Sequence, residues 1–413
     1  MNPFTHPSKP VEDNFLSWHK MYPKSYDKKT VSRCTKVRVI LMNGTEFESV
    51  WFLHQFARNT KDNDLRRDLS LVRCQEQQQQ KRISCLKPID ETVLEETIAY
   101  EQLAIELTAI LAQNEENIEA KKALDFALLE DFDHLYRFAN LLKMDYGIDS
   151  EGLVAHYTEI MPGRPTISEH RHPYDNVRRP SKNADINDYS KLVTSIITAA
   201  EQQTMNFYMN VAQIYKNDLG RRLFQEIGMI EEQHVTQYES LKDPTCNWFE
   251  SWVMHEYTEC YLYYSMAEQE TCEYIKEIWQ EHFEMEVSHL KLALKHLKKN
   301  TGKDIHDLIN TEEFPMLLIF GENKHYIRSV IENTVYNTSY LEDYVDTREL
   351  KDKTRFVFYQ DAVNKKVSDV ASHKVIECAI ELFGEDYRYE TEKHPISELS
   401  LRTKDNTTVG RVE

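Results

Sequence analysis

One pattern of acidic residues and histidines recurs three times at the same spacing, and it restricts the fold more than any other feature of the chain. In each copy a glutamate is followed 30 residues later by a second acid and 33 residues later by a histidine. The copies are Glu101, Asp131 and His134; Glu201, Glu231 and His234; and Glu256, Glu286 and His289. Each spans two segments with helical apolar periodicity, so we expect three pairs of antiparallel helices joined by short turns.

The distribution of proline supports long helices in the same places. No proline falls between Pro88 and Pro162, between Pro180 and Pro244, or between Pro244 and Pro315. Proline breaks helix interiors, so long helices are expected inside these windows. The predicted helices are 89–114 and 117–146, 185–217 and 219–242, and 247–270 and 272–299.

The regions outside the repeat are predicted to be less regular. Val37 to Met42, followed by Asn43-Gly44, is typical of a short strand and turn. A polar helix is expected over Leu65–Cys85, with the run Gln77 to Gln80 on its solvated face. After Lys299 we expect shorter helices near 316–340 and 367–383 and then a polar tail.

These expectations divide the chain into three parts. Residues 1–88 form an N-terminal region, residues 89–299 form a helical domain with a long connection at 148–184, and residues 300–413 form a C-terminal helical region and tail. The predicted class is all-α, with small additions at both ends of the helical domain.

The acids and histidines of the repeat lie where an amphipathic helix has apolar residues. Asp131, for example, shares its row with Leu128 and Leu135. A buried carboxylate without a partner is very costly, so several in one core must take up protons or bind cations. Residues three apart share a helix face, so an acid and its histidine can bind one ion. Mixed carboxylate and imidazole donors suit iron or manganese. We therefore predict that all nine repeat residues are metal ligands.

This pattern resembles the ferritin-like superfamily, with rubrerythrin-like hairpins as the nearest match. The matching stretches are Glu201 with Glu231-Glu232-Gln233-His234, Glu256 with Glu286-Val287-Ser288-His289, and Glu101 with Asp131-Phe132-Asp133-His134, where Asp replaces the usual Glu. The resemblance covers about residues 90–299. It implies a ferritin-like bundle, built here from three hairpins, that holds two iron ions, two manganese ions or one of each and reacts with oxygen or peroxide. The chain departs from the family in having three half-sites where the family uses two.

Link lengths indicate which half-sites pair. The link between His134 and Glu201 is long enough for the crossover of such a bundle, whereas the short link between His234 and Glu256 makes its helices antiparallel neighbours. We therefore expect the first two copies to form one site. The third copy could pair with the second, pair with another molecule of the chain, or pack as a degenerate repeat.

Several other polar residues near the repeat are expected to be structural. Glu130, Asp133, Glu232 and Glu259 are predicted to be helix-surface charges. Tyr208 and Tyr263, each seven residues after a repeat glutamate, are predicted to be core aromatics rather than redox partners. His170, Arg171 and His172 are expected in a solvated loop.

Charge and composition exclude some classes of partner. The 50 basic and 69 acidic residues give a net charge of −19, which argues against nucleic acid and anionic membranes. No apolar run is long enough to span a bilayer, and Met1 to Asn14 lacks a secretory signal. The seven scattered cysteines contain no Cys-x-x-Cys pair and are typical of a reducing cytoplasm.

Together these observations predict a cytoplasmic, non-haem two-metal oxidoreductase, acting as an oxidase, oxygenase or peroxidase. Its partners would be oxygen or peroxide, a small-molecule substrate of unspecified identity and a separate electron donor. Two alternatives stay open: a protein that stores or oxidises iron, and a metal-free helical scaffold whose repeat forms an interaction surface. A homodimer built through the region after Lys299 also stays open.

Overall fold

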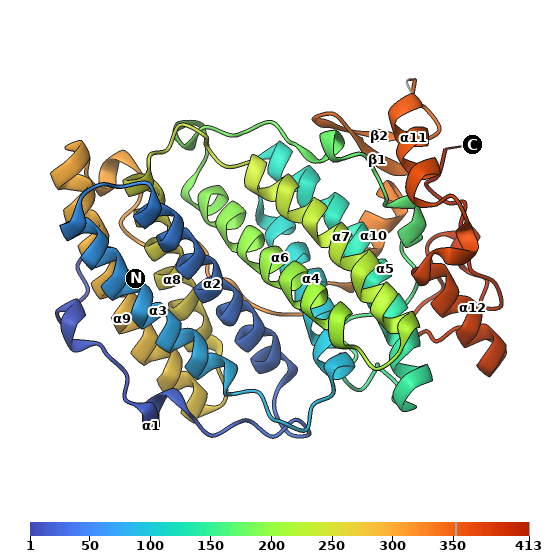
Figure 1. Ribbon diagram of the computed structural model, residues 1–413, viewed down its shortest axis with the longest axis horizontal. Coiled ribbons are helices and arrows are strands. Elements are labelled where there is room, and N and C mark those ends of the chain that lie inside the picture. Colours follow the sequence, from blue (N-terminus) through green and yellow to red (C-terminus); the bar gives the residue numbers. More distant parts are fainter. Residues whose placement is uncertain (352, 413) are drawn as a thin grey trace. The chain divides into compact units, whose positions relative to one another are not determined.

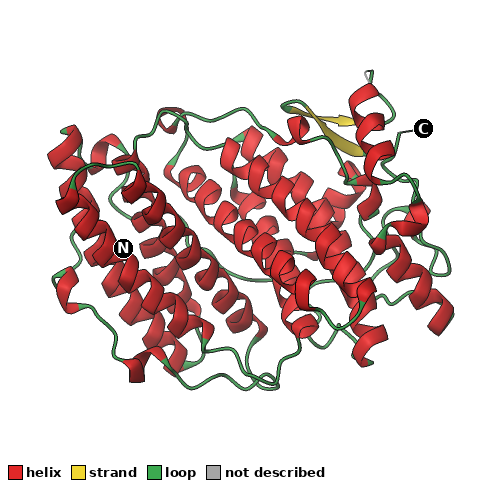
Figure 2. Ribbon diagram, viewed as in Figure 1, coloured by secondary structure: helices red, strands yellow, loops and turns green. Residues whose placement is uncertain are grey.

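The computed structural model describes residues 1–351 and 353–412, and helices dominate them (Figure 2). Within these ranges there are twelve α-helices and one two-stranded sheet, which confirms the all-α class. The long helices are α2 (Arg33–Arg58), α3 (Asn63–Ser84), α4 (Val93–Asn114), α5 (Ile118–Tyr146), α6 (Asp188–Ile214), α7 (Asp218–Ser240), α8 (Trp248–Gln269) and α9 (Glu273–Thr301). A short α1 (Trp18–Met21) precedes them. No helix of the described residues is both long and apolar enough to cross a membrane.

Capping residues explain where the repeat helices begin. Thr92 and Glu95 form a reciprocal capping box at the start of α4, and Asn247 and Glu250 form another at the start of α8. In each box the two side chains satisfy backbone N–H groups that have no partner inside the helix. Helix α5 ends at Gly147, whose φ of 66° is readily adopted only by glycine.

The chain divides into two compact units, each assembled from segments far apart in the sequence. The first contains residues 1–91, 180–203 and 242–319, and the second contains residues 92–179, 204–241 and 320–413. Helix α6 begins in the first unit and ends in the second.

In the first unit, α2, α3, α8 and α9 lie side by side (Figure 1). The strand expected at Val37 to Met42 is wrong, because this segment lies inside α2 and its six residues are only 0–4% exposed. A helix buried on every side has no apolar–polar period, so its short apolar run resembles a strand. Gly44 continues the helix and leaves room for Gln203, whose Oε1 would lie 2.8 Å from any Cβ at this position.

In the second unit, α4 packs on α5, α5 packs on α7, and the ring of Phe207 at the end of α6 stacks on Tyr100 of α4. The C-terminal region adds α10 (Lys324–Thr334), α11 (Thr354–Val363) and α12 (Ala371–Phe383), of which α10 and α12 pack against α5. Helix α12 confirms the helix expected near 367–383.

One expectation for the C-terminal region is wrong. The helix expected at 316–340 is limited to α10, and an antiparallel hairpin of β1 (Asn337–Tyr340) and β2 (Asp343–Asp346) follows it. Asn, Thr and Ser are poor helix formers, which favours the end of α10. The tail after Gly384 does not extend into solvent, because Tyr389 pairs with Ile160 and Asp386 is buried.

Candidate metal centres

The second unit contains a buried group of carboxylates and imidazoles on three helices. Glu101 comes from α4, Asp131 and His134 come from α5, and Glu231 and His234 come from α7. Each of these five residues has 0% exposure. The three-residue spacing within α5 and within α7 places each acid and its histidine on one helix face.

Glu231 lies at the middle of this group. Its Oε1 is 3.1 Å from Nδ1 of His134, and its Oε2 is 3.1 Å from Nδ1 of His234. Within the second unit, two sets of ligand atoms, each within 4.8 Å of one another, share this carboxylate: Glu101, His134 and Glu231 in one, and Asp131, Glu231 and His234 in the other. A carboxylate shared between two such sets is placed to bridge two ions.

The electrostatics of the group favour cations. Burial opposes ionisation of Glu231, but hydrogen bonds from His134 and His234 outweigh it and lower its pKa to about 2. Burial raises the pKa of Glu101 well above its usual range and also raises that of Asp131. Oε2 of Glu101 and Oδ2 of Asp131 have no hydrogen-bond partner among the described residues. Buried polar atoms nearly always have a hydrogen-bond partner or a bound ion, so these oxygens are candidates for binding a cation.

A further carboxylate contacts the Nε2 atom of each histidine, on the side of the ring away from Glu231. Nε2 of His134 lies 3.0 Å from Oε2 of Glu169, and Nε2 of His234 lies 2.9 Å from Oε2 of Glu130. A carboxylate on one ring nitrogen fixes the orientation of the imidazole and makes the other nitrogen a better ligand. The rings therefore present Nδ1 to the centre.

Two arginines form ion pairs with Glu130 and balance its negative charge. Nη1 of Arg171 lies 2.6 Å from Oε1 of Glu130, and Arg164 also pairs with this oxygen. Burial opposes ionisation of Glu130, but these arginines hold its pKa well below its usual range. Among the described residues no arginine side chain forms an ion pair with Glu169, and burial raises the pKa of this carboxyl to about 7.

The sequence-based assignment of surface charges is wrong for three of four acids. Glu130 and Asp133 have 0% exposure and Glu259 has 1%, whereas Glu232 is exposed as expected. The solvated loop expected around Arg171 is also wrong for this residue, which is 1% exposed. The reason is that residues 158–169 and the C-terminal helices cover the outer side of α5, which its own sequence cannot reveal.

The third copy of the repeat lies in the first unit, where it meets α3. Nδ1 of His289 is 3.1 Å from Oε2 of Glu286, 3.0 Å from Oε1 of Glu76 and 3.8 Å from Oε2 of Glu256. These four residues form one set of candidate ligands, and Glu46, Glu76 and Glu259 form another. The partner of the third copy is thus the N-terminal helix pair α2 and α3, which none of the three alternatives anticipated.

The sequence contained a signal for this partner. Glu46, Glu76 and Gln79 repeat the spacing of 30 and 33 residues, with glutamine in place of histidine. A search that requires histidine misses this fourth copy. Gln79 was expected on a solvated face, but it is fully buried and its Nε2 donates a hydrogen bond to Glu286.

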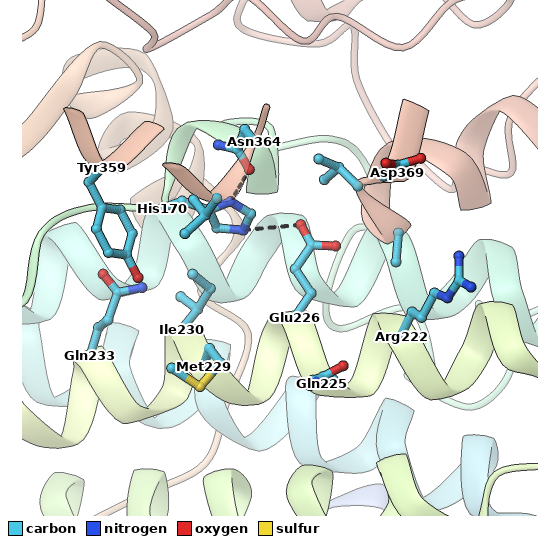
Figure 3. Close-up of a pocket in the computed structure, with 13 residues that line it drawn as sticks. His170, Arg222, Gln225, Glu226, Met229, Ile230, Gln233, Tyr359, Asn364 and Asp369 are labelled. Atoms are coloured by element: carbon cyan, nitrogen blue, oxygen red, sulfur yellow. Dashed lines mark hydrogen bonds and ion pairs between the residues drawn. The ribbon is translucent and has the colours of Figure 1, made fainter. Parts of the chain in front are cut away.

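A groove of about 760 Å³ lies along the face of α7 that carries Glu226, Met229 and Gln233 (Figure 3). Tyr359 and Gln233 lie at one end of it and Arg222 and Asp369 at the other. His170 lies inside it, with Nε2 3.1 Å from Oε1 of Glu226. The preceding residue, Glu169, contacts His134, so adjacent residues face the groove and the buried centre.

No protein-family model, curated protein or solved structure matches this chain.

Proposed function

We propose that the second unit is a ferritin-like, two-metal oxidoreductase centre that activates oxygen or peroxide. The observation that supports this most strongly is the position of Glu231 between two imidazole Nδ1 atoms, at 3.1 Å from each. A glutamate from each of two helices and an acid-x-x-His pair from each of two others is the ligand arrangement of two-metal carboxylate bundles. Glu101, Asp131, His134, Glu231 and His234 are the proposed ligands from this unit. Glu201, in the part of α6 that belongs to the first unit, is the sixth residue of the predicted set.

The donor set favours iron or manganese. Carboxylates suit hard ions such as manganese, whereas imidazole suits iron and other transition metals. When bound, a redox-active pair would supply electrons to oxygen or peroxide and stabilise the charge that develops there.

The protein's own residues provide binding, orientation and exclusion of water. Glu130 and Glu169 fix the two imidazole rings, and Arg164 and Arg171 balance the charge of Glu130. Since the ligands on α4, α5 and α7 are fully buried, bulk water is kept from the centre. The groove on the outer face of α7 is the proposed place for an organic substrate, because it combines apolar walls at Met229 and Val363 with polar ends.

Metal analysis of a matched pair of variants tests the proposal. Glu231→Gln removes the shared carboxylate, and Glu232→Gln changes the neighbouring, solvent-exposed acid. After anaerobic reconstitution with Fe²⁺ or Mn²⁺, we expect Glu231→Gln to hold about two ions fewer per chain than the control and to lose oxygen consumption. Equal metal content in the two variants would contradict the ligand assignment.

The same preparation separates oxidoreductase from iron handling. Oxygen uptake that continues in step with repeated additions of Fe²⁺, with ferric product accumulating, would favour the iron-handling alternative. Uptake that depends on an electron donor and an added organic substrate supports the proposed activity.

A further inference from the structure

We infer that the first unit holds a second two-metal centre with a different donor set, in which one of the two ions is bound by oxygen atoms alone. This centre is separate from the proposed function, because its ligands all come from α2, α3, α8 and α9. The ion beside His289 would be held by Glu76, Glu256, Glu286 and His289, and the other ion by Glu46, Glu76 and Glu259.

The candidate ligands of the first unit include more carboxylates for each imidazole than those of the second unit. Five glutamates meet here at no more than 1% exposure, against the single imidazole of His289; they are Glu46, Glu76, Glu256, Glu259 and Glu286. Glu76 belongs to both ligand sets, as Glu231 does in the second unit. Such a group is stable only with bound cations or with several retained protons.

Individual oxygen atoms in this group indicate a position for a cation. Neither oxygen of Glu259 has a hydrogen bond or an ion pair among the described residues, although the side chain is 1% exposed. Oε2 of Glu46 and the amide oxygen Oε1 of Gln79 are buried and also lack a hydrogen-bond partner. A carboxylate can reduce its cost by taking up a proton, but an amide oxygen cannot. Unpaired acceptors from three helices therefore indicate a cation.

Comparison of the two units by sequence position explains the oxygen-only set. Gln79 occupies the position that His134 has in the second unit, so one imidazole is lost. Glu259 lies one turn after Glu256, where the second unit has Thr204. The first unit has thus exchanged an imidazole for a carboxylate and an amide oxygen.

This exchange determines which ion fits. Oxygen-only ligand sets suit hard divalent ions, and manganese is the redox-active member of that group. We therefore assign Mn²⁺ to the position formed by Glu46, Glu76 and Glu259. The position beside His289 accepts either Mn²⁺ or Fe²⁺.

The experiment uses the full chain with the second-unit centre disabled by Glu231→Gln. After anaerobic reconstitution with Mn²⁺ and removal of free ions, we expect about two bound Mn²⁺ per chain. Adding Glu259→Gln should remove about one of them, whereas adding Glu284→Gln, an exposed acid on α9, should remove none. Thermal unfolding of each variant checks that the fold is retained.

The possible outcomes are distinct for the two centres. Absence of bound Mn²⁺ in Glu231→Gln, or equal Mn²⁺ in the Glu259→Gln and Glu284→Gln variants, would overturn the inference. Failure of the second-unit proposal would instead show as equal metal content in Glu231→Gln and Glu232→Gln.

A gain-of-function variant adds a spectroscopic test. Gln79→His with Glu259→Thr recreates the second-unit donors and should raise the preference for Co²⁺ over Mn²⁺ by about tenfold or more, as followed by Co²⁺ absorption. An unchanged preference would also count against the assignment.

Discussion

Tyrosine hydroxyl groups form hydrogen bonds with carboxylates in both buried groups of acids and histidines. Tyr208 donates a hydrogen bond to Oε1 of Glu101 at 2.5 Å, and Tyr263 donates one to Glu46. Each tyrosine lies seven residues after the repeat glutamate of its own helix but bonds to the glutamate of a different helix pair. Both side chains are fully buried. Their common role is to fix a terminal carboxylate in one orientation.

Glu169 should control metal affinity without being a ligand itself. Replacing it by glutamine removes the charge that faces Nε2 of His134, so the imidazole becomes a weaker donor. We expect Glu169→Gln to bind metal about tenfold to a hundredfold more weakly in the second unit. Competition with a chelator of known affinity gives the dissociation constant. Affinity equal to that of the unsubstituted protein would show that this contact has no part in binding.

At the scale of elements, the connection between α5 and α6 is part of the centre rather than a linker. Residues 158–169 are all buried, and this stretch supplies Arg164 and Glu169. Its backbone lies close to that of α5 at Gly163, where an added Cβ would lie 2.7 Å from the carbonyl oxygen of Leu129. Only glycine allows this approach, because the contact is with backbone that cannot move aside.

Gly163→Ala should therefore push the connection away from α5. The overpacking should cost about 1–3 kcal/mol of unfolding free energy and weaken metal binding, since Arg164 follows directly. Gly152→Ala is the matched control, because nothing lies within 4 Å of a Cβ at that position. Urea unfolding monitored by circular dichroism measures both variants. Equal stability of the two would show that the connection adjusts freely.

For the whole molecule, buried carboxylates make the metal-free protein sensitive to pH. Burial and the neighbouring Glu76 raise the pKa of Glu286 from 4.5 to about 7, and His289 opposes this rise only in part. Burial likewise holds the pKa of Glu46 and Glu256 well above the usual range. A group whose pKa is higher in the folded state stabilises the fold below its unfolded value, and this stability is lost as pH rises through the folded value.

The metal-free chain should therefore melt at a lower temperature at about pH 8 than at about pH 5. Between pH 4.5 and about 7 Glu286 keeps its proton in the folded chain but not in the unfolded chain, and above about 7 it is ionised in both. Glu231 contributes nothing to this change, because its pKa of about 2 keeps it ionised at both values. Bound metal replaces the protons, so saturation with Mn²⁺ should remove the difference. Differential scanning calorimetry with and without chelator makes the comparison. A higher melting temperature at pH 8 without metal would reverse the expected sign.

The long helices could be predicted from the sequence because their signals are local. Proline-free windows, capping residues such as Thr92 and Asn247, and helical periodicity all act within one or two turns. The same local periodicity placed the acids and histidines of the repeat at core positions of their helices. This periodicity is absent from Val37 to Met42, because that part of α2 is buried on all sides, and the segment was therefore predicted as a strand.

The tertiary structure alone decided which helices share a core. The pairing of α8 and α9 with α2 and α3 depends on burial between segments about two hundred residues apart, for which no local pattern exists. The carboxylates behind the imidazoles, Glu130 and Glu169, were hidden for the same reason. Glu130 lies on α5 at a position outside the repeated spacing, and Glu169 lies in a connection without any periodicity. The repeat thus indicated which acids and histidines are buried at core positions, and long-range packing determined how they are divided between two units.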